Sequence, residues 1–261
     1  MSHHSGSSNK GNMAKKEVLS IFEVLWKPDY NRAIIAVVAV MLAQQLCGMP
    51  PLHSSSLAKL SSNSLPTNFL LLTSCHTGIN SIIMYGVSLL ADLLKSNSAL
   101  LNIFVSILNV IVTLSCAPLA DIVGRKVCIL ASIAIMGSSS ILLAIGIKQG
   151  LSALSAISVL AFVAGFGLGL GPVPFILSSE LVGPEAVGAT QSWALVANWI
   201  ATFIVAQFFP MLNEKLGKGN VYFLFAGLAA FFFVFIAWWV PETMGKKDAD
   251  EVWGRETRRE D

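Results

Sequence analysis

Long apolar runs separated by short polar stretches dominate this 261-residue chain. A bilayer core of roughly 30 Å is crossed by about 20 helical residues. Backbone groups in lipid need internal hydrogen bonds, so the pattern predicts helices and not open strands. The runs are, in order, Ala33–Cys47, Ile79–Leu94, Leu100–Leu119, Val127–Ile147, Leu154–Leu177, Val187–Phe209 and Val221–Val240.

The first two runs are too short to cross alone. As a helix, Ala33–Cys47 reaches at most about 23 Å at 1.5 Å per residue, and the next run contains Asp92. The predicted fold class is therefore an all-α polytopic membrane protein with six transmembrane helices, the first assembled from two pieces. The expected organisation is a cytoplasmic tail (1–32), a bundle (33–240) interrupted by a polar insert (49–77), and a cytoplasmic tail (241–261).

Composition and charge support a membrane protein. The chain is 54% hydrophobic and 12% charged, whereas soluble domains carry about a quarter charged residues. With six spans, twelve Lys and Arg residues fall on one side and five on the other, which predicts that both termini are cytoplasmic. The net charge of +2 then reflects topology, and no nucleic-acid partner is expected. The pattern does not distinguish the plasma membrane from an internal, vacuolar-type membrane.

The sequence offers no recognisable enzymatic chemistry. Its four cysteines show neither metal-ligand spacing nor a disulfide framework. We find no nucleophile elbow, P-loop or zinc motif. Neither a metal, a cofactor nor an enzymatic activity is therefore expected.

Polar residues and helix breakers inside the apolar runs are the candidate functional positions. Asn109 belongs to a polar stripe with Ser106 and Thr113, which indicates either a cavity or hydrogen bonds between helices. Asn198 and Thr202 form a second polar face. Two prolines follow alternating glycines in 165–175, which predicts a broken helix of the kind that lines transporter cavities.

Five short strings together resemble the sugar porters of the major facilitator superfamily. Gln44–Gly48 joined to Ile79-Asn80 resembles the signature of the seventh helix in that family. The others are Ala120–Lys126, Gly171–Phe175 with Ser179–Leu181, Asn198-Trp199, and Pro241–Lys246. Ile21–Arg32 is similar to the end of the central cytoplasmic loop. The resemblance covers about residues 20–250 without 49–77, and it corresponds to the C-terminal six-helix half of a twelve-helix transporter.

The resemblance assigns sugar contacts to amide and aromatic side chains. Amides suit sugar hydroxyls because each donates and accepts hydrogen bonds without a charge. Phe175 stands where Trp is common, and Thr202 stands where a second Asn is frequent, which implies altered hydroxyl selectivity. The implied substrate-binding residues are Gln44, Gln45, Asn80, Asn109, Phe175, Asn198 and Thr202.

The resemblance also implies a cytoplasmic lock formed by Asp121, Arg125 and Glu180, and a broken-helix hinge at Gly171, Pro172 and Pro174. Asp121 and Arg125 are four residues apart and can pair at a helix end. The family's usual arginine partner of Glu180 is replaced here by Val187. We therefore expect the acidic end of this helix to take a cation from elsewhere.

Residues 49–77 separate the two pieces of the first motif. The motif resumes in register if 30 residues are removed, which favours a retained intron over an ordinary exposed loop. With the insert in place, the first helix is not expected to assemble correctly, because polar backbone at membrane depth needs protein partners.

The function that the resemblance implies is monosaccharide transport by alternating access between two six-helix bundles. The implied partners are a monosaccharide, a proton if the parent protein is a symporter, the lipid bilayer and the missing N-terminal six-helix bundle. This chain would then be a truncated half with limited autonomous activity. The alternatives are a non-transporting membrane sugar sensor and a half-size partner that dimerises; the short C-terminal tail argues against the sensor.

Overall fold

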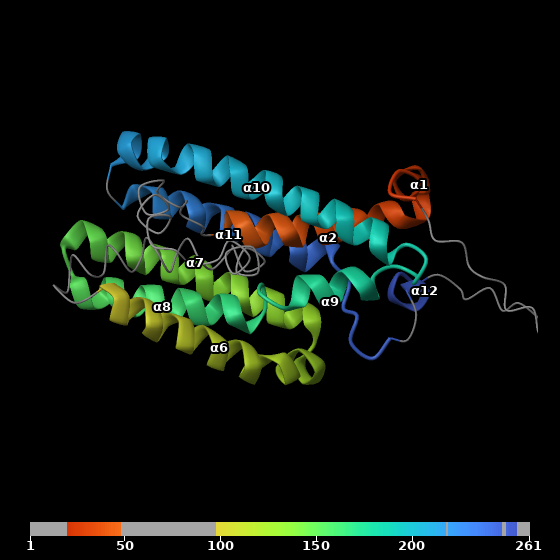
Figure 1. The fold of residues 1–261 in the computed structure, drawn as a ribbon, viewed down its shortest axis with the longest axis horizontal. Helices are drawn as coiled ribbons and strands as arrows, with labels where there is room; N and C mark the ends of the chain where they lie inside the picture. Colours follow the sequence, from red (N-terminus) through yellow and green to blue (C-terminus); the bar gives the residue numbers. More distant parts are fainter. Residues whose placement is uncertain (1–19, 48–97, 218, 247–248, 255–261) are drawn as a thin grey trace, which may run out of the picture.

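A computed structural model describes residues 20–47, 98–217, 219–246 and 249–254 as an all-helical bundle (Figure 1). The elements are α1 (Glu23–Trp26), α2 (Pro28–Leu46), α6 (Ser98–Val123), α7 (Arg125–Gln149), α8 (Ser152–Leu168), α9 (Val173–Glu180), α10 (Val187–Leu216), α11 (Asn220–Trp239) and α12 (Ala249–Val252). The insert 49–77 and the second piece of the expected first span lie outside the described residues.

Four stretches are long and apolar enough to cross a membrane: Arg125–Gln149, Ser152–Glu180, Val187–Phe209 and Asn220–Trp239. They coincide with the last four predicted runs. α2, which carries the first predicted run, ends at Leu46. The described residues therefore contain four clear candidate spans, and the expected total of six stays a prediction.

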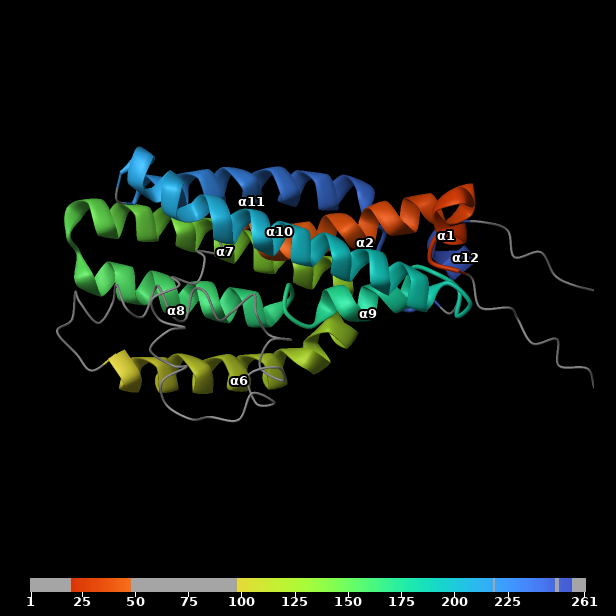
Figure 2. The same cartoon turned by 45° about the horizontal axis from the view of Figure 1, so that its top comes forward.

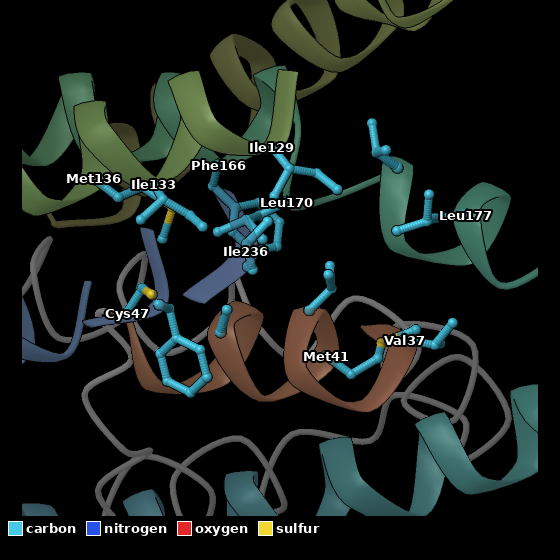
Figure 3. Close-up of a cluster of buried hydrophobic side chains, with 14 of the residues drawn as sticks. Val37, Met41, Cys47, Ile129, Ile133, Met136, Phe166, Leu170, Leu177 and Ile236 are labelled. Atoms are coloured by element: carbon cyan, nitrogen blue, oxygen red, sulfur yellow. The ribbon is translucent and has the colours of Figure 1, made fainter. Parts of the chain in front are cut away.

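The helices pack side by side, as two views of the bundle show (Figures 1 and 2). α7 lies between α8 and α11, and α2 packs against α10 and α11. α6 lies on the outer side of α8 (Figure 2). The core is apolar and forms where α2, α7, α8–α9 and α11 meet, with Met41, Ile133, Leu170 and Ile236 fully buried (Figure 3). These contacts place α2 beside the α8–α9 break.

Glycine permits the sharp turn between α6 and α7. Gly124 has φ +112°, a backbone conformation that side-chain-bearing residues rarely adopt. A Cβ at this position would also lie 2.7 Å from Glu242 Oε2. The turn therefore brings the C-terminal segment after α11 directly against the first residues of α7.

Candidate sugar-binding site and charged network

The helix is interrupted between α8 and α9, where Gly171 and Pro172 lie, whereas Pro174 lies in the first turn of α9 and the role of the three residues as a hinge stays a prediction. α8 ends at Leu168 and α9 begins at Val173. Proline lacks a backbone donor and disfavours a continuous helix. The segment between the two helices exposes backbone carbonyls to neighbouring helices, and the Leu170 carbonyl is one of them.

Three of the predicted sugar-contacting amides meet beside this break. Asn198 Nδ2 donates a hydrogen bond to Gln44 Oε1 at 3.0 Å, and Gln45 Nε2 donates to Asn198 Oδ1. Gln44 Nε2 donates to the Leu170 carbonyl at 2.8 Å. The three side chains, from α2 and α10, thus form one connected amide network that ends on the helix break.

Two further side chains complete the network. The Thr202 hydroxyl donates to the Asn198 carbonyl at 2.9 Å, one turn earlier on α10. Asn198 Nδ2 also lies 3.6 Å from the sulfur of Met41, which sequence reasoning had not assigned to the site. Gln45 is 2% exposed, and its Oε1 has no hydrogen-bond partner among the residues that the structure describes. The network therefore keeps one buried acceptor that a hydroxyl donor could satisfy.

Of the other three predicted sugar contacts, the structure describes only the side chain of Phe175, which is not part of this network. Phe175 lies in the first turn of α9 and is 40% exposed. Asn109 belongs to α6, but its side chain lies outside the described residues, and so does Asn80. The structure thus assembles Gln44, Gln45, Asn198 and Thr202, and it leaves the other three positions as predictions.

The amide network lies near the middle of the candidate spans. Asn198 is at the centre of the span Val187–Phe209. By contrast, a groove of about 350 Å³ between α7 and α11 is lined by Gly137, Ala226, Ala229 and other mostly apolar residues, with Ser138 as the one hydroxyl. Because that groove offers almost no hydrogen-bonding groups, it does not suit a sugar, whereas the amide network does.

A charged network lies at the end of the bundle where α1 and α12 are found (Figure 1). Arg125 pairs with Asp121 at 2.8 Å and with Glu180 at 3.0 Å. The Asp121–Arg125 pair is the one expected from their spacing. Glu180, whose usual partner position is Val187, takes its cation from the start of α7 instead.

The C-terminal segment joins the same network. Glu242 Oε1 accepts the backbone N–H groups of Arg125 and Thr243 at 2.9 and 3.1 Å, and the Thr243 hydroxyl donates to Glu180 Oε2. A carboxylate at the first turn of a helix satisfies donors that the helix cannot and interacts favourably with its dipole. The motif Pro241–Lys246 contributed to the family resemblance, but the sequence alone gave Glu242 no role.

A tyrosine links the beginning of α2 to the α9–α10 connection. Tyr30 donates a hydrogen bond to Glu185 Oε1 at 3.0 Å. The pKa of Tyr30 is raised to about 12, first by burial and then by the hydrogen bond and the negative charge of Glu185, with smaller contributions from Asp250 and Asp29. The phenol therefore stays protonated and donating throughout the physiological pH range.

The family model described as "Sugar (and other) transporter" matches residues 61–252, more than half of the chain. The chain belongs to this family of transporters. The family and the apolar helices together show an integral membrane protein.

Individual relatives agree with this assignment. A probable metabolite transport protein of Saccharomyces cerevisiae is 41% identical over 90% of this chain and 42% of its own length. The facilitated trehalose transporter Tret1 of Aedes aegypti is 30% identical over 67% of this chain and 23% of its own length. The facilitated glucose transporter member 3 of Rattus norvegicus is 24% identical over 91% of this chain and 43% of its own length.

Solved structures show the same fold. The major facilitator proton:xylose symporter XylE, bound to 6-bromo-6-deoxy-D-glucose, superposes with a TM-score of 0.65 at 22% identity, over 85% of this chain and 42% of the symporter. The described helices thus have the arrangement of one half of a major facilitator transporter. The chain spans less than half the length of these relatives.

Within the described residues, no group of three or more His, Cys, Asp or Glu side chains could hold a metal ion.

Four groups of the two networks were not predicted from the sequence: Met41, Glu242, Thr243 and the Leu170 carbonyl. Glu242 could have been found as a carboxylate next to the apolar run that ends at Val240. The Leu170 carbonyl carries no sequence signal, because a backbone acceptor is the same at every residue.

Proposed function

We propose that this chain supplies the C-terminal half of a monosaccharide-binding site in a transporter that works by alternating access. The observation that carries the proposal is the amide network of Gln44, Gln45 and Asn198, which lies beside the broken helix and bonds to it through Gln44. Amides on facing helices near the middle of the spans, next to unwound backbone, form the kind of site in which transporters bind substrates.

The chemistry of the network suits a neutral polyhydroxyl ligand. Amide groups both donate and accept, and the charged residues resolved in contact with one another lie at the end of the bundle, away from Asn198. Gln45 Oε1 is a ready acceptor for one hydroxyl. The relatives named as glucose and trehalose transporters and the xylose symporter make sugars the substrate class to test.

The charged network at the bundle end is proposed as the cytoplasmic lock. Of the described cations, Lys27, Arg32, Arg125, Lys126 and Lys246 lie at this end, whereas Lys148 and Lys215 lie at the opposite ends of α7 and α10. The excess of positive charge favours a cytoplasmic location for this end, and for both tails. In this proposal the Arg125–Glu180 pair forms when the cytoplasmic side is closed and separates when it opens.

We further propose that a complete six-helix bundle and a second bundle are needed for transport, because alternating access requires two bodies that move against each other. This chain alone is then expected to bind sugar weakly and to transport little. Whether the parent protein couples sugar to a proton is a matter for the other half of the site.

The experiment is equilibrium binding of radiolabelled D-glucose, D-xylose and trehalose to the purified chain in lipid nanodiscs, with L-glucose as the stereochemical control. Asn198→Ala should weaken binding of the preferred sugar by about 5- to 150-fold, because it leaves buried amide groups of Gln44 and Gln45 unpaired. The matched control is Gln191→Ala, two turns earlier on α10 and outside the network.

Saturable binding of a D-sugar that Asn198→Ala weakens and Gln191→Ala leaves unchanged would support the proposed site. Binding that both variants leave unchanged would place the sugar elsewhere. If none of the sugars bound either to this chain or to its complex with an N-terminal half, the sugar-binding function itself would be wrong.

A further inference from the structure

The break between α8 and α9 leaves backbone groups that the helix itself no longer pairs. The Gly171 N–H bonds to the Phe166 carbonyl at 2.9 Å, which is the acceptor that the Leu170 N–H would use in a regular α-helix. The Leu170 N–H is therefore displaced from the helical pattern. Leu170 is fully buried, so water does not satisfy this donor, and an unpaired buried N–H is costly.

A serine from the neighbouring helix α7 satisfies the displaced donor. Ser132 Oγ accepts the Leu170 N–H at 3.1 Å and donates its own proton to the Gly165 carbonyl at 2.6 Å. Ser132 is fully buried in the middle of an apolar helix. One hydroxyl thus pairs an acceptor in the last turn of α8 and a donor within the break, as Ser and Thr side chains do where membrane helices are interrupted.

The same region shows a backbone approach that only glycine allows. A Cβ on Gly169 would collide with the Cys128 carbonyl, one turn before Ser132 on α7. The first turns of α7 therefore press directly on the broken segment. This close contact fixes the distance over which Ser132 reaches the break.

Leu170 connects Ser132 to the amide network. Its N–H bonds to Ser132, and its carbonyl accepts the hydrogen bond of Gln44 Nε2. Since Gln44 also accepts from Asn198, a rotation of the Leu170 backbone would change the acceptor to which the Gln44 amide is anchored. The hydrogen bonds thus run from α7 through the break to α2 and α10.

We propose that Ser132 is a positioning residue: its hydroxyl holds the conformation of the α8–α9 break and, through the Leu170 carbonyl, orients the Gln44 amide for the ligand. The orienting part rests on the proposed function, whereas the structural part does not. Ser132 itself need not touch the ligand.

The test compares Ser132→Ala with Ser140→Ala in the full chain in nanodiscs. Ser140 is also buried on α7, two turns later, but among the described residues its hydroxyl bonds only to the Met136 carbonyl of its own helix. Hydrogen–deuterium exchange is measured for residues 166–173, and D-glucose binding is measured on the same samples. Ser132→Thr restores a hydroxyl, and Ser132→Cys keeps the side-chain volume if the alanine variant does not fold.

We expect Ser132→Ala to accelerate exchange in residues 166–173 by about 5- to 150-fold, the range for one unpaired buried group. Ser140→Ala should leave that segment unchanged. D-glucose binding should weaken at least 5-fold in Ser132→Ala and recover in Ser132→Thr. The cysteine variant should resemble alanine, because a thiol is a weak donor and acceptor.

Exchange that is the same in Ser132→Ala and in the unaltered chain would overturn the proposal. Faster exchange with unchanged D-glucose affinity would overturn the link through Leu170. Faster exchange in a chain that binds none of D-glucose, D-xylose and trehalose, alone or with an N-terminal half, would support the role of Ser132 at the break and would count against the proposed function, so the two failures are distinguishable.

Discussion

Replacing Arg125 by Gln tests which acidic partner makes the charged network stable. The Arg125 side chain is 15% exposed, Glu180 is 28% exposed and Asp121 is 68% exposed. An exposed ion pair contributes about 0.2–1 kcal/mol. Removing one partner of a fully buried pair costs about 3–5 kcal/mol. The partial exposure of Glu180 and its hydrogen bond from Thr243 reduce that cost to about 1.5–3 kcal/mol, as for a charged hydrogen bond.

Arg125→Gln should therefore lower the free energy of unfolding by about 2–4 kcal/mol, most of it through Glu180. The assay is reversible unfolding in mixed detergent micelles with two double-mutant cycles, one with Glu180→Gln and one with Asp121→Asn. The coupling energy should be about 1–2 kcal/mol for Glu180 and below about 0.5 kcal/mol for Asp121, and only the latter should fall strongly in 1 M salt. Lys126→Gln changes the same charge at the next residue and serves as control.

The reasoning would be refuted if Asp121 coupled to Arg125 as strongly as Glu180 does. That result would mean that exposure does not decide the strength of this network. The proposed lock would then rest on the Asp121 pair within the α6–α7 connection, and the link from α7 to α9 would carry little free energy.

Three further predictions concern other contacts. Gly124→Ala should lower the free energy of unfolding by about 1–3 kcal/mol, because Gly124 has a positive φ and a Cβ there would displace the Glu242 carboxylate. Gly188→Ala is the control: Gly188 lies in a helix, a Cβ there meets no atom, and the substitution should raise the free energy of unfolding by about 0.5–1 kcal/mol. Equal effects of the two substitutions in chemical unfolding would contradict this prediction. Because the pKa of Tyr30 rises to about 12 in the folded chain, its stabilising contribution should be complete below pH 10 and disappear as the pH rises from 10 to 12. The measurement is the difference in the free energy of unfolding between the unaltered chain and Tyr30→Phe as a function of pH. A difference that does not change between pH 10 and 12 would contradict the prediction. Trp253 Nε1 donates a hydrogen bond to the Leu181 carbonyl at 3.0 Å. Trp253→Phe should therefore increase the rate of proteolysis after α12 and leave D-glucose binding unchanged. Weakened D-glucose binding would instead show that α12 contributes to the site.

The interruption of the helix between Leu168 and Val173 followed from local sequence. Prolines lack a backbone donor wherever they occur, and alternating glycines allow close approach. The lengths and hydropathies of the last four runs likewise predicted helices that the structure contains. The family resemblance was also carried by short local strings, and the family comparison confirms it.

The partners across the bundle did not follow from spacing. Glu180 pairs with a residue 55 positions away, and Gln44 bonds to a carbonyl 126 positions away. The sequence predicted the polar face of Asn198 and Thr202, but it did not show that Asn198 would join both glutamines of α2. Such pairings depend on how helices are placed side by side, and helical periodicity contains no information on that placement.

By itself, the sequence determined that the last four apolar runs are helices, where one of them breaks and which polar side chains they carry, because each depends on the chemistry of a few neighbouring residues. Only the tertiary structure decided that Ser132 pairs the backbone of the break, that Arg125 is the cation of Glu180 and that Glu242 binds the first turn of α7. These pairings arise because buried donors and acceptors need hydrogen-bond partners on a neighbouring helix. Which helix is the neighbour depends on the fold as a whole.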